Sequence, residues 1–134
     1  MRERFGSSNW SLQVAEGWDT WHDADCASIA RRELGCGALQ LSAALRDSEV
    51  TDGDLLDFAA KEVEAGLKGV PVLTSEFGGY LFTFVRDGAF WRRWYLRKGS
   101  LALFVTYNCN VEERGVEDAD VDEMMVSLST IAAG

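Results

Sequence analysis

The sequence predicts an α+β fold, in which a twisted antiparallel sheet carries two main helices. Residues 72–109 alternate apolar and polar side chains, as strands with one buried face do. Asp87-Gly88 interrupts this alternation with a strong hairpin signal, because both central residues of a type I′ turn need positive φ. Two other segments repeat apolar residues at helical spacing. The resulting order of strands, helix, meander and helix favours antiparallel pairing.

The first third of the chain predicts four strands after a loosely ordered start at residues 1–8. Residues 10–14 alternate apolar and polar side chains and form the first strand. A short strand follows at 18–21, and two longer strands are expected at 26–34 and 37–45. With 134 residues and no linker or repeat, the chain is expected to form one domain over residues 1–134.

The period changes after residue 50, where we expect a helix of roughly four turns. Thr51 is a good N-cap, and Asp52 and Asp54 place negative charge where the helix dipole favours it. The helix is expected to end between Gly66 and Pro71. Its apolar stripe recurs every four residues: Leu55, Ala59, Val63 and Leu67.

The meander that follows is predicted as strands at 72–76, 77–86, 89–98 and 100–109. A last helix is predicted from Asp120 as its N-cap, with Glu123 three residues later. Its apolar stripe is expected to comprise Val121, Met124, Met125, Leu128 and Ile131.

The net charge of −9 disfavours contact with nucleic-acid phosphates and with anionic membranes. The charge is uneven, because residues 86–98 hold five basic side chains against Asp87, a local charge of +4. No apolar run reaches the roughly 20 residues that span a bilayer, and no signal-peptide stretch follows the N-terminus. We therefore expect a cytoplasmic protein that binds neither nucleic acid nor membrane.

The sequence shows no catalytic or metal-binding set. His22 is the only histidine, and no second cluster of His or Cys completes the three or four ligands of a metal site. Cys26, Cys36 and Cys109 are an odd number without CxxC spacing, which is typical of free thiols. We therefore expect a protein without catalytic activity, cofactor or metal.

The most unusual segment is the strand 90–98, where aromatic and basic side chains mix on both faces. Trp, Tyr and Arg are the residue types enriched at binding hot spots. The predicted binding surface comprises Trp91, Arg92, Arg93, Trp94, Tyr95 and Arg97, together with Trp18 and Trp21 of the short strand. The alternative is a central strand whose aromatics pack under both helices while its arginines pair with acids on neighbouring elements.

Several segments also share a pattern with a known fold. The opening strand ends in Gly-Trp, the segment 37–41 reads Gly-Ala-Leu-Gln-Leu, and 103–107 reads Leu-Phe-Val-Thr-Tyr before a final helix with Met-Val-Ser-Leu at 125–128. In these features the chain resembles the PsbP-like fold family, which includes a photosystem subunit, a Ran-binding nucleotide-release factor and bacterial chaperones of type VI secretion effectors. The resemblance implies an α/β/α sandwich used mainly for protein binding, and it assigns no functional residue.

Two functional hypotheses follow. The first is a non-enzymatic protein-binding module, such as a chaperone, an adaptor or an immunity-type partner of another bacterial protein. The alternative is a small-ligand binder with an aromatic pocket in which Arg92 or Arg93 orients an anion. The oligomeric state and the strand order stay open.

Overall fold

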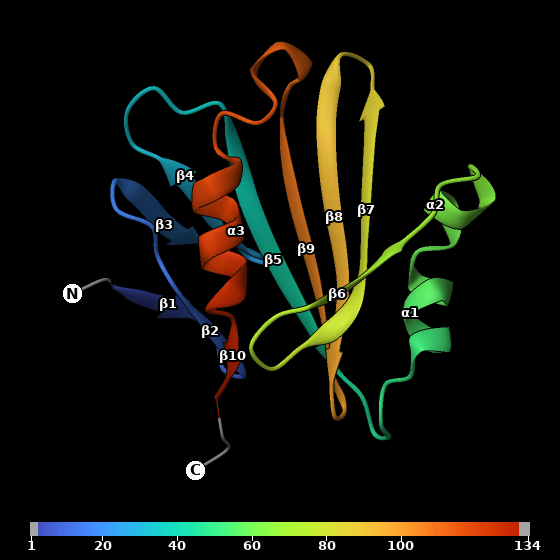
Figure 1. The fold of residues 1–134 in the computed structure, drawn as a ribbon. Helices are drawn as coiled ribbons and strands as arrows, with labels where there is room; N and C mark the ends of the chain where they lie inside the picture. The colour runs from blue at the N-terminus through green and yellow to red at the C-terminus, as the bar shows by residue number, and fades with distance from the viewer. Residues whose placement is uncertain (1–2, 132–134) are drawn as a thin grey trace.

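A computed structural model describes residues 3–131 as two antiparallel sheets with three α-helices (Figure 1). This confirms the predicted α+β class and the antiparallel pairing. The larger sheet has seven strands in the order β3-β4-β5-β9-β8-β7-β6. Their bounds are Trp18–His22 (β3), Ala27–Arg31 (β4), Gly37–Leu45 (β5), Val70–Leu73 (β6), Gly78–Arg86 (β7), Ala89–Lys98 (β8) and Leu101–Asn110 (β9).

A smaller sheet joins the two ends of the described chain. Its order is β1-β2-β10, with bounds Arg4–Gly6 (β1), Trp10–Gln13 (β2) and Ser129–Thr130 (β10). Residues 4–6 lie within the start that we expected to be loose, yet they pair with β2. β10 pairs with the other side of β2. The two strands were not predicted because each is too short to show an alternating pattern.

The helices are α1 (Asp52–Phe58), α2 (Ala60–Glu64) and α3 (Asp118–Val126), with a single 3₁₀ turn at Val111–Glu113. Thr51 caps α1 as predicted, and its partner in the capping box is Asp54. The one predicted helix is divided at Ala59, whose ψ of 21° departs from helical geometry.

The predicted N-cap of the last helix was wrong. The helix begins at Asp118 with Glu117 as N-cap, and Asp120 lies inside its first turn. The helix also ends at Val126, so neither Leu128 nor Ile131 is part of its stripe, although Leu128 is buried in the core. Ser129 and Thr130 pair with β2 instead, which satisfies their main-chain groups in a sheet rather than in a helix.

Two predicted strands were also too long or displaced. The strand expected at 26–34 ends at Arg31, and Leu34 adopts a positive φ of 55° in the turn that follows. The strand expected at 72–76 lies at Val70–Leu73, because the Thr74 hydroxyl accepts a hydrogen bond from the Phe77 amide and holds residues 74–77 in a turn.

The core lies mainly on one face of the large sheet, where α3 and the small sheet cover it (Figure 1). A smaller cluster of Val50, Leu55 and Ala102 lies on the opposite face under α1. The two faces of the sheet are therefore covered by different elements and to different extents.

None of the helices in residues 3–131 has both the length and the apolar character of a membrane span.

The β7–β8 turn has the conformation predicted from Asp87-Gly88, with φ values of 53° and 78°. A Cβ at Gly88 would meet no atom within 4 Å, so only backbone conformation penalises a larger residue there. We expect Gly88→Ala to lower the free energy of unfolding by about 1 kcal/mol in urea titrations. Asp87→Asn is the control and should leave stability unchanged, since Asn accepts positive φ. Equal stability of Gly88→Ala and wild type would contradict this account of the turn.

Candidate binding surface

The structure divides the predicted surface residues between the two faces of the large sheet. Successive residues of β8 alternate, so Trp91, Arg93, Tyr95 and Arg97 lie on the face of α1 and α2. Arg92 and Trp94 lie on the α3 face. The register also places Trp18 on the α3 face and Trp21 on the other. The eight predicted residues therefore do not form one continuous surface.

The predicted residues on the α3 face belong to the interior. Trp18 and Trp94 are each only 4% exposed. The Trp18 indole Nε1–H donates to Asp120 at 2.9 Å, which ties β3 to α3. The guanidinium of Arg92 lies 4.7 Å from the centre of the Trp94 ring and donates to Asp122 at 2.7 Å. On this face the structure supports the alternative in which arginines pair with neighbouring acids.

On the opposite face, Glu62 of α2 is the acid that binds side chains of β8. Its carboxylate is buried and accepts hydrogen bonds from Arg93 Nη1 at 2.6 Å and from the Tyr95 hydroxyl at 3.0 Å. Desolvation acts to raise the pKa of Glu62, but these hydrogen bonds and a backbone bond lower it overall. Burial and the bond to Glu62 raise the pKa of Tyr95 to about 12. Arg97 also finds an acid, Asp52 of α1, at 2.7 Å.

On the face of α1 and α2, the rings of Trp21, Phe84 and Trp91 are accessible to solvent. Trp91 stacks on Phe84 with ring centres 6.2 Å apart, and the guanidinium of Arg93 lies 4.8 Å from the Trp91 ring. Arg86 lies 5.3 Å from the Phe84 ring. Trp21, on the edge strand β3, is 44% exposed. These side chains are partly or largely exposed because no helix lies over this half of the sheet.

Cross-strand register shows that these rings belong to one surface. One row of directly paired residues runs from Trp21 through the buried Ser28, Gln40 and Thr106 to Arg93. The next row runs from Ala30 through Ala38 and Asn108 to Trp91 and Phe84. Within residues 3–131, the hydrogen bonds, ion pairs and ring contacts of α1 and α2 with the sheet reach Arg93, Tyr95, Arg97 and Phe104, and none reaches the Trp91 row. We call this uncovered area, formed by Trp21, Ala30, Ala38, Gln40, Phe84, Trp91, Thr106 and Asn108, the open sheet face.

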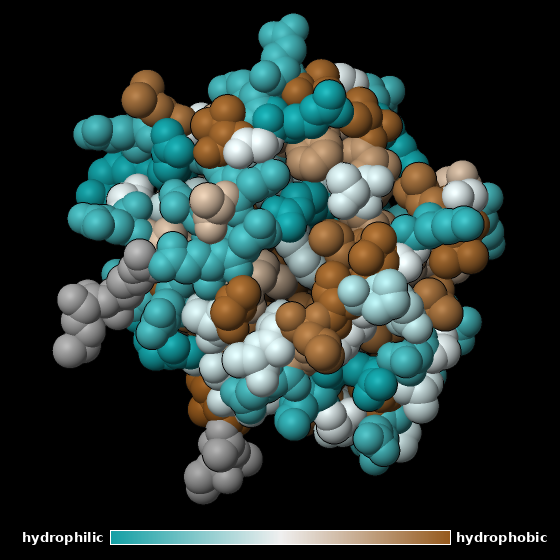
Figure 2. Space-filling view, in the orientation of Figure 1, coloured by the Kyte–Doolittle hydropathy of each residue, from teal (hydrophilic) through white to brown (hydrophobic). Residues whose placement is uncertain are grey.

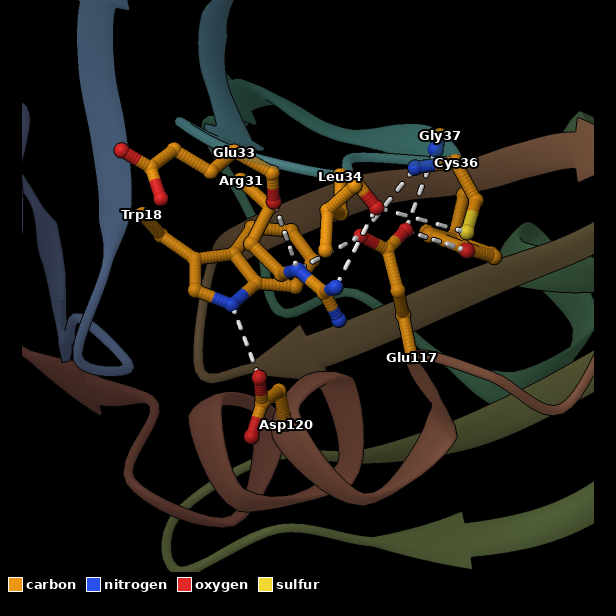
Figure 3. A network of polar contacts seen from close by, with 9 residues as sticks. Trp18, Arg31, Glu33, Leu34, Cys36, Gly37, Glu117 and Asp120 are labelled. Atoms are coloured by element: carbon orange, nitrogen blue, oxygen red, sulfur yellow. Dashed lines mark hydrogen bonds and ion pairs between the residues drawn. The ribbon is translucent and has the colours of Figure 1, made fainter.

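No pattern in the sequence pointed to Glu117, although its side chain has four polar partners. Its buried carboxylate accepts hydrogen bonds from the Tyr107 hydroxyl at 2.7 Å and from the Gly37 amide at 3.0 Å (Figure 3). It also faces Arg31 at 3.7 Å. Burial and the bond to Glu117 raise the pKa of Tyr107. Glu117 thus joins the start of α3 to the β4–β5 turn, since Gly37 and Arg31 lie far from it in the chain.

His22 and the cysteines are side chains that could act as metal ligands or nucleophiles. Among residues 3–131, no three His, Cys, Asp or Glu side chains come together as metal ligands. The ring of His22 packs against Phe5 with centres 4.8 Å apart. Burial and a hydrogen bond with Glu113 raise the pKa of the Cys36 thiol to about 11, which opposes formation of a nucleophilic thiolate.

Two hollows of about 420 and 450 Å³ lie beside the start of β3 and share Glu16, Gly17 and Arg32 in their linings. Their volumes are in the range of small-molecule sites. However, Arg32 is already bound to Asp19 at 2.7 Å. Arg31, which also lines the first hollow, donates to the carbonyl oxygens of Glu33 and Leu34. Neither hollow brings an uncommitted arginine together with the predicted aromatic residues.

Comparison with known proteins relates this chain to others through its fold. No protein family and no curated protein matches the sequence. A structure from Bacteroides thetaiotaomicron superposes with a TM-score of 0.71 at 15% identity, over 93% of this chain and 46% of that one. LpqN, involved in cell envelope biogenesis of Mycobacterium tuberculosis, superposes with a TM-score of 0.67 at 11% identity, over 98% and 91%. The chain thus spans about half of the Bacteroides protein, and these similarities show the fold alone.

Removal of the Glu117 carboxylate should destabilise the fold strongly. Glu117→Ala leaves the Tyr107 hydroxyl and the Gly37 amide without an acceptor, so we expect a loss of about 3 kcal/mol in urea unfolding. Glu112→Ala, at an exposed acid of the preceding turn, should change stability by less than about 0.5 kcal/mol. Similar values for the two variants would show that the network contributes little.

Glu62 should make stability depend on pH. Because its pKa in the folded state lies below the ordinary value of 4.5, its contribution is complete above that value and is lost as pH falls through the folded-state pKa. We expect the stability advantage of wild type over Glu62→Gln to shrink as pH is lowered from about 7 to about 3. Glu64→Gln, at an exposed acid of the same helix, is the control in the same urea titrations. An advantage that stays constant with pH would contradict the assignment.

Proposed function

We propose that this protein is a non-enzymatic protein-binding module, of the chaperone, adaptor or immunity-partner kind, and that its contact surface is the open sheet face. The proposal rests on one observation: the rings of Trp21, Phe84 and Trp91 are partly exposed on the open sheet face, which no helix covers. Large aromatic side chains supply most of the energy in protein interfaces, because they bury much apolar area at little conformational cost.

The shape of the surface supports a protein partner rather than a small molecule. The rings lie at the two sides of the open sheet face, on β3 at one side and on β7 and β8 at the other. The strands between them carry short side chains such as Ala30, Ala38 and Thr106. A broad surface with short side chains between aromatic anchors suits an extended interface, whereas small ligands need an enclosed pocket.

The free thiols Cys26, Cys36 and Cys109 suit a reducing compartment, and we propose that the protein is cytoplasmic.

The fold similarity adds only a little to this proposal. Proteins of the PsbP-like fold family mainly bind other proteins, which agrees with the proposal. The resemblance of this chain to that family rests on sequence pattern. LpqN is involved in cell envelope biogenesis, and a role near the envelope is open to this chain only by analogy of fold. The proposal therefore depends on the aromatic side chains themselves.

Affinity capture from the native cell tests the proposal. We expect wild type to recover one partner in a fixed ratio by mass spectrometry. The double variant Trp21→Ser, Trp91→Ser should lose it, because each ring removed takes away more than about 1 kcal/mol of binding energy. Leu34→Ser is the matched control, since Leu34 is 88% exposed and lies in the β4–β5 turn. Recovery of the partner by the double variant, or of no partner by wild type, would refute the proposal.

A further inference from the structure

The free edge of β6 has unused main-chain hydrogen-bonding groups. β6 ends the seven-stranded sheet and pairs with β7 alone. The Thr74 amide donates to the Phe77 carbonyl at 2.8 Å. Because hydrogen-bonded and non-bonded pairs alternate in an antiparallel ladder, the bonded pairs of β6 are those of Val70 and Val72. The main-chain groups of Pro71 and Leu73 therefore point away from β7.

This arrangement leaves one donor and two acceptors at the edge: the Leu73 amide and the carbonyl oxygens of Pro71 and Leu73. No hydrogen bond from residues 3–131 reaches any of them. Proline has no amide hydrogen, so its position on the outward register costs the β6–β7 ladder nothing. Edge groups of this kind are a template for an added strand.

A hollow lies on each side of the sheet next to this edge. On the α3 side, an open hollow of about 180 Å³ lies between β6 and α3, with Leu81, Trp94 and Met125 in its lining. On the α1 side, about 380 Å³ is lined by Pro71, Gly79 and Tyr80, among others. Successive side chains of an added strand would point alternately to the two faces and therefore into the two hollows.

Apolar surface surrounds the same edge. Figure 2 shows hydrophobic side chains gathered over β6 and the last turn of α3. Leu73 is 86% exposed, Val126 63% and Val70 59%. Burial of these side chains would add a hydrophobic contribution to main-chain pairing.

The charged groups in the two hollows restrict the occupant. Arg92 pairs with Asp122 at 2.7 Å in the α3-side hollow, and Arg97 pairs with Asp52 at 2.7 Å in the α1-side hollow, so neither lining carries a net charge. An uncharged side chain can enter these hollows without losing ion hydration, whereas a charged side chain would be desolvated there beside groups that are already paired.

We propose that β6 binds an extended, uncharged segment of a partner protein as an additional strand of the large sheet. Its main chain bonds to Leu73 and Pro71, and its alternate side chains fill the hollows beside Trp94 and beside Tyr80. Strand addition uses this division of roles, with affinity from main-chain bonds and specificity from side-chain pockets. The site is separate from the open sheet face and does not depend on it.

The test uses a phage-displayed library of random segments of about eight residues, a usual strand length, selected on the full chain. We expect enriched peptides with apolar or hydroxyl residues, and no charged residues, at the successive positions that face the two hollows. Hydrogen exchange followed by NMR should show the Leu73 amide slowed on addition of a selected peptide. The Val72 amide, already in the ladder, should change little.

Two variants separate strand addition from other modes of binding. Leu73→Pro removes the outward donor, and Gly78→Val narrows the α1-side hollow, where a Cβ would lie 3.4 Å from Leu73 Cδ2. Each should weaken binding of the selected peptide at least tenfold by calorimetry, while Trp21→Ser should bind it as wild type does. Failure to enrich any peptide, unchanged exchange at Leu73, or equal affinity of Gly78→Val and wild type would overturn the proposal.

Discussion

The arrangement of this protein depends on the alternation of β8, which points basic side chains to both faces of the sheet. A guanidinium under a helix needs a partner, because an unpaired buried charge is costly. Arg92 finds Asp122 of α3, Arg93 finds Glu62 of α2, and Arg97 finds Asp52 of α1. Each helix is thus joined to the same central strand by an ion pair.

These pairs orient the helices more than they stabilise the fold. Asp52 and Asp122 are more than half exposed, and pairs of that kind contribute about 0–1 kcal/mol. Glu62 differs because it is buried, so loss of its partner would leave an unsatisfied charge. The larger contribution to stability comes from the apolar core on the α3 face. The ion pairs then decide where on the sheet each helix lies.

What the sequence predicts well is local in the chain. The bounds of β8 were predicted to the residue because Asp87-Gly88 sets the hairpin register, and α1 was located by its capping box. The pairing of β10 with β2 and the contacts of Glu117 with Gly37 and Arg31 join segments more than 70 residues apart, and no short pattern encodes them. The same limit applies to the binding surface. Periodicity assigned the aromatic side chains to two faces, but only the helix positions decide which face stays open.

The incomplete cover follows from simple dimensions. Seven strands at about 4.8 Å spacing make a sheet about 29 Å wide, and one helix covers a width of about 10 Å. α3 and the small sheet together cover most of one face, but α1 and α2 are short and lie towards β7, β8 and β9.

The local charge of +4 in residues 86–98 is largely neutralised by acids within the fold, so it attracts few anions from outside. With a net charge of −9, the molecule favours neutral or basic partners, which agrees with an apolar contact on the sheet face and an uncharged strand at the β6 edge.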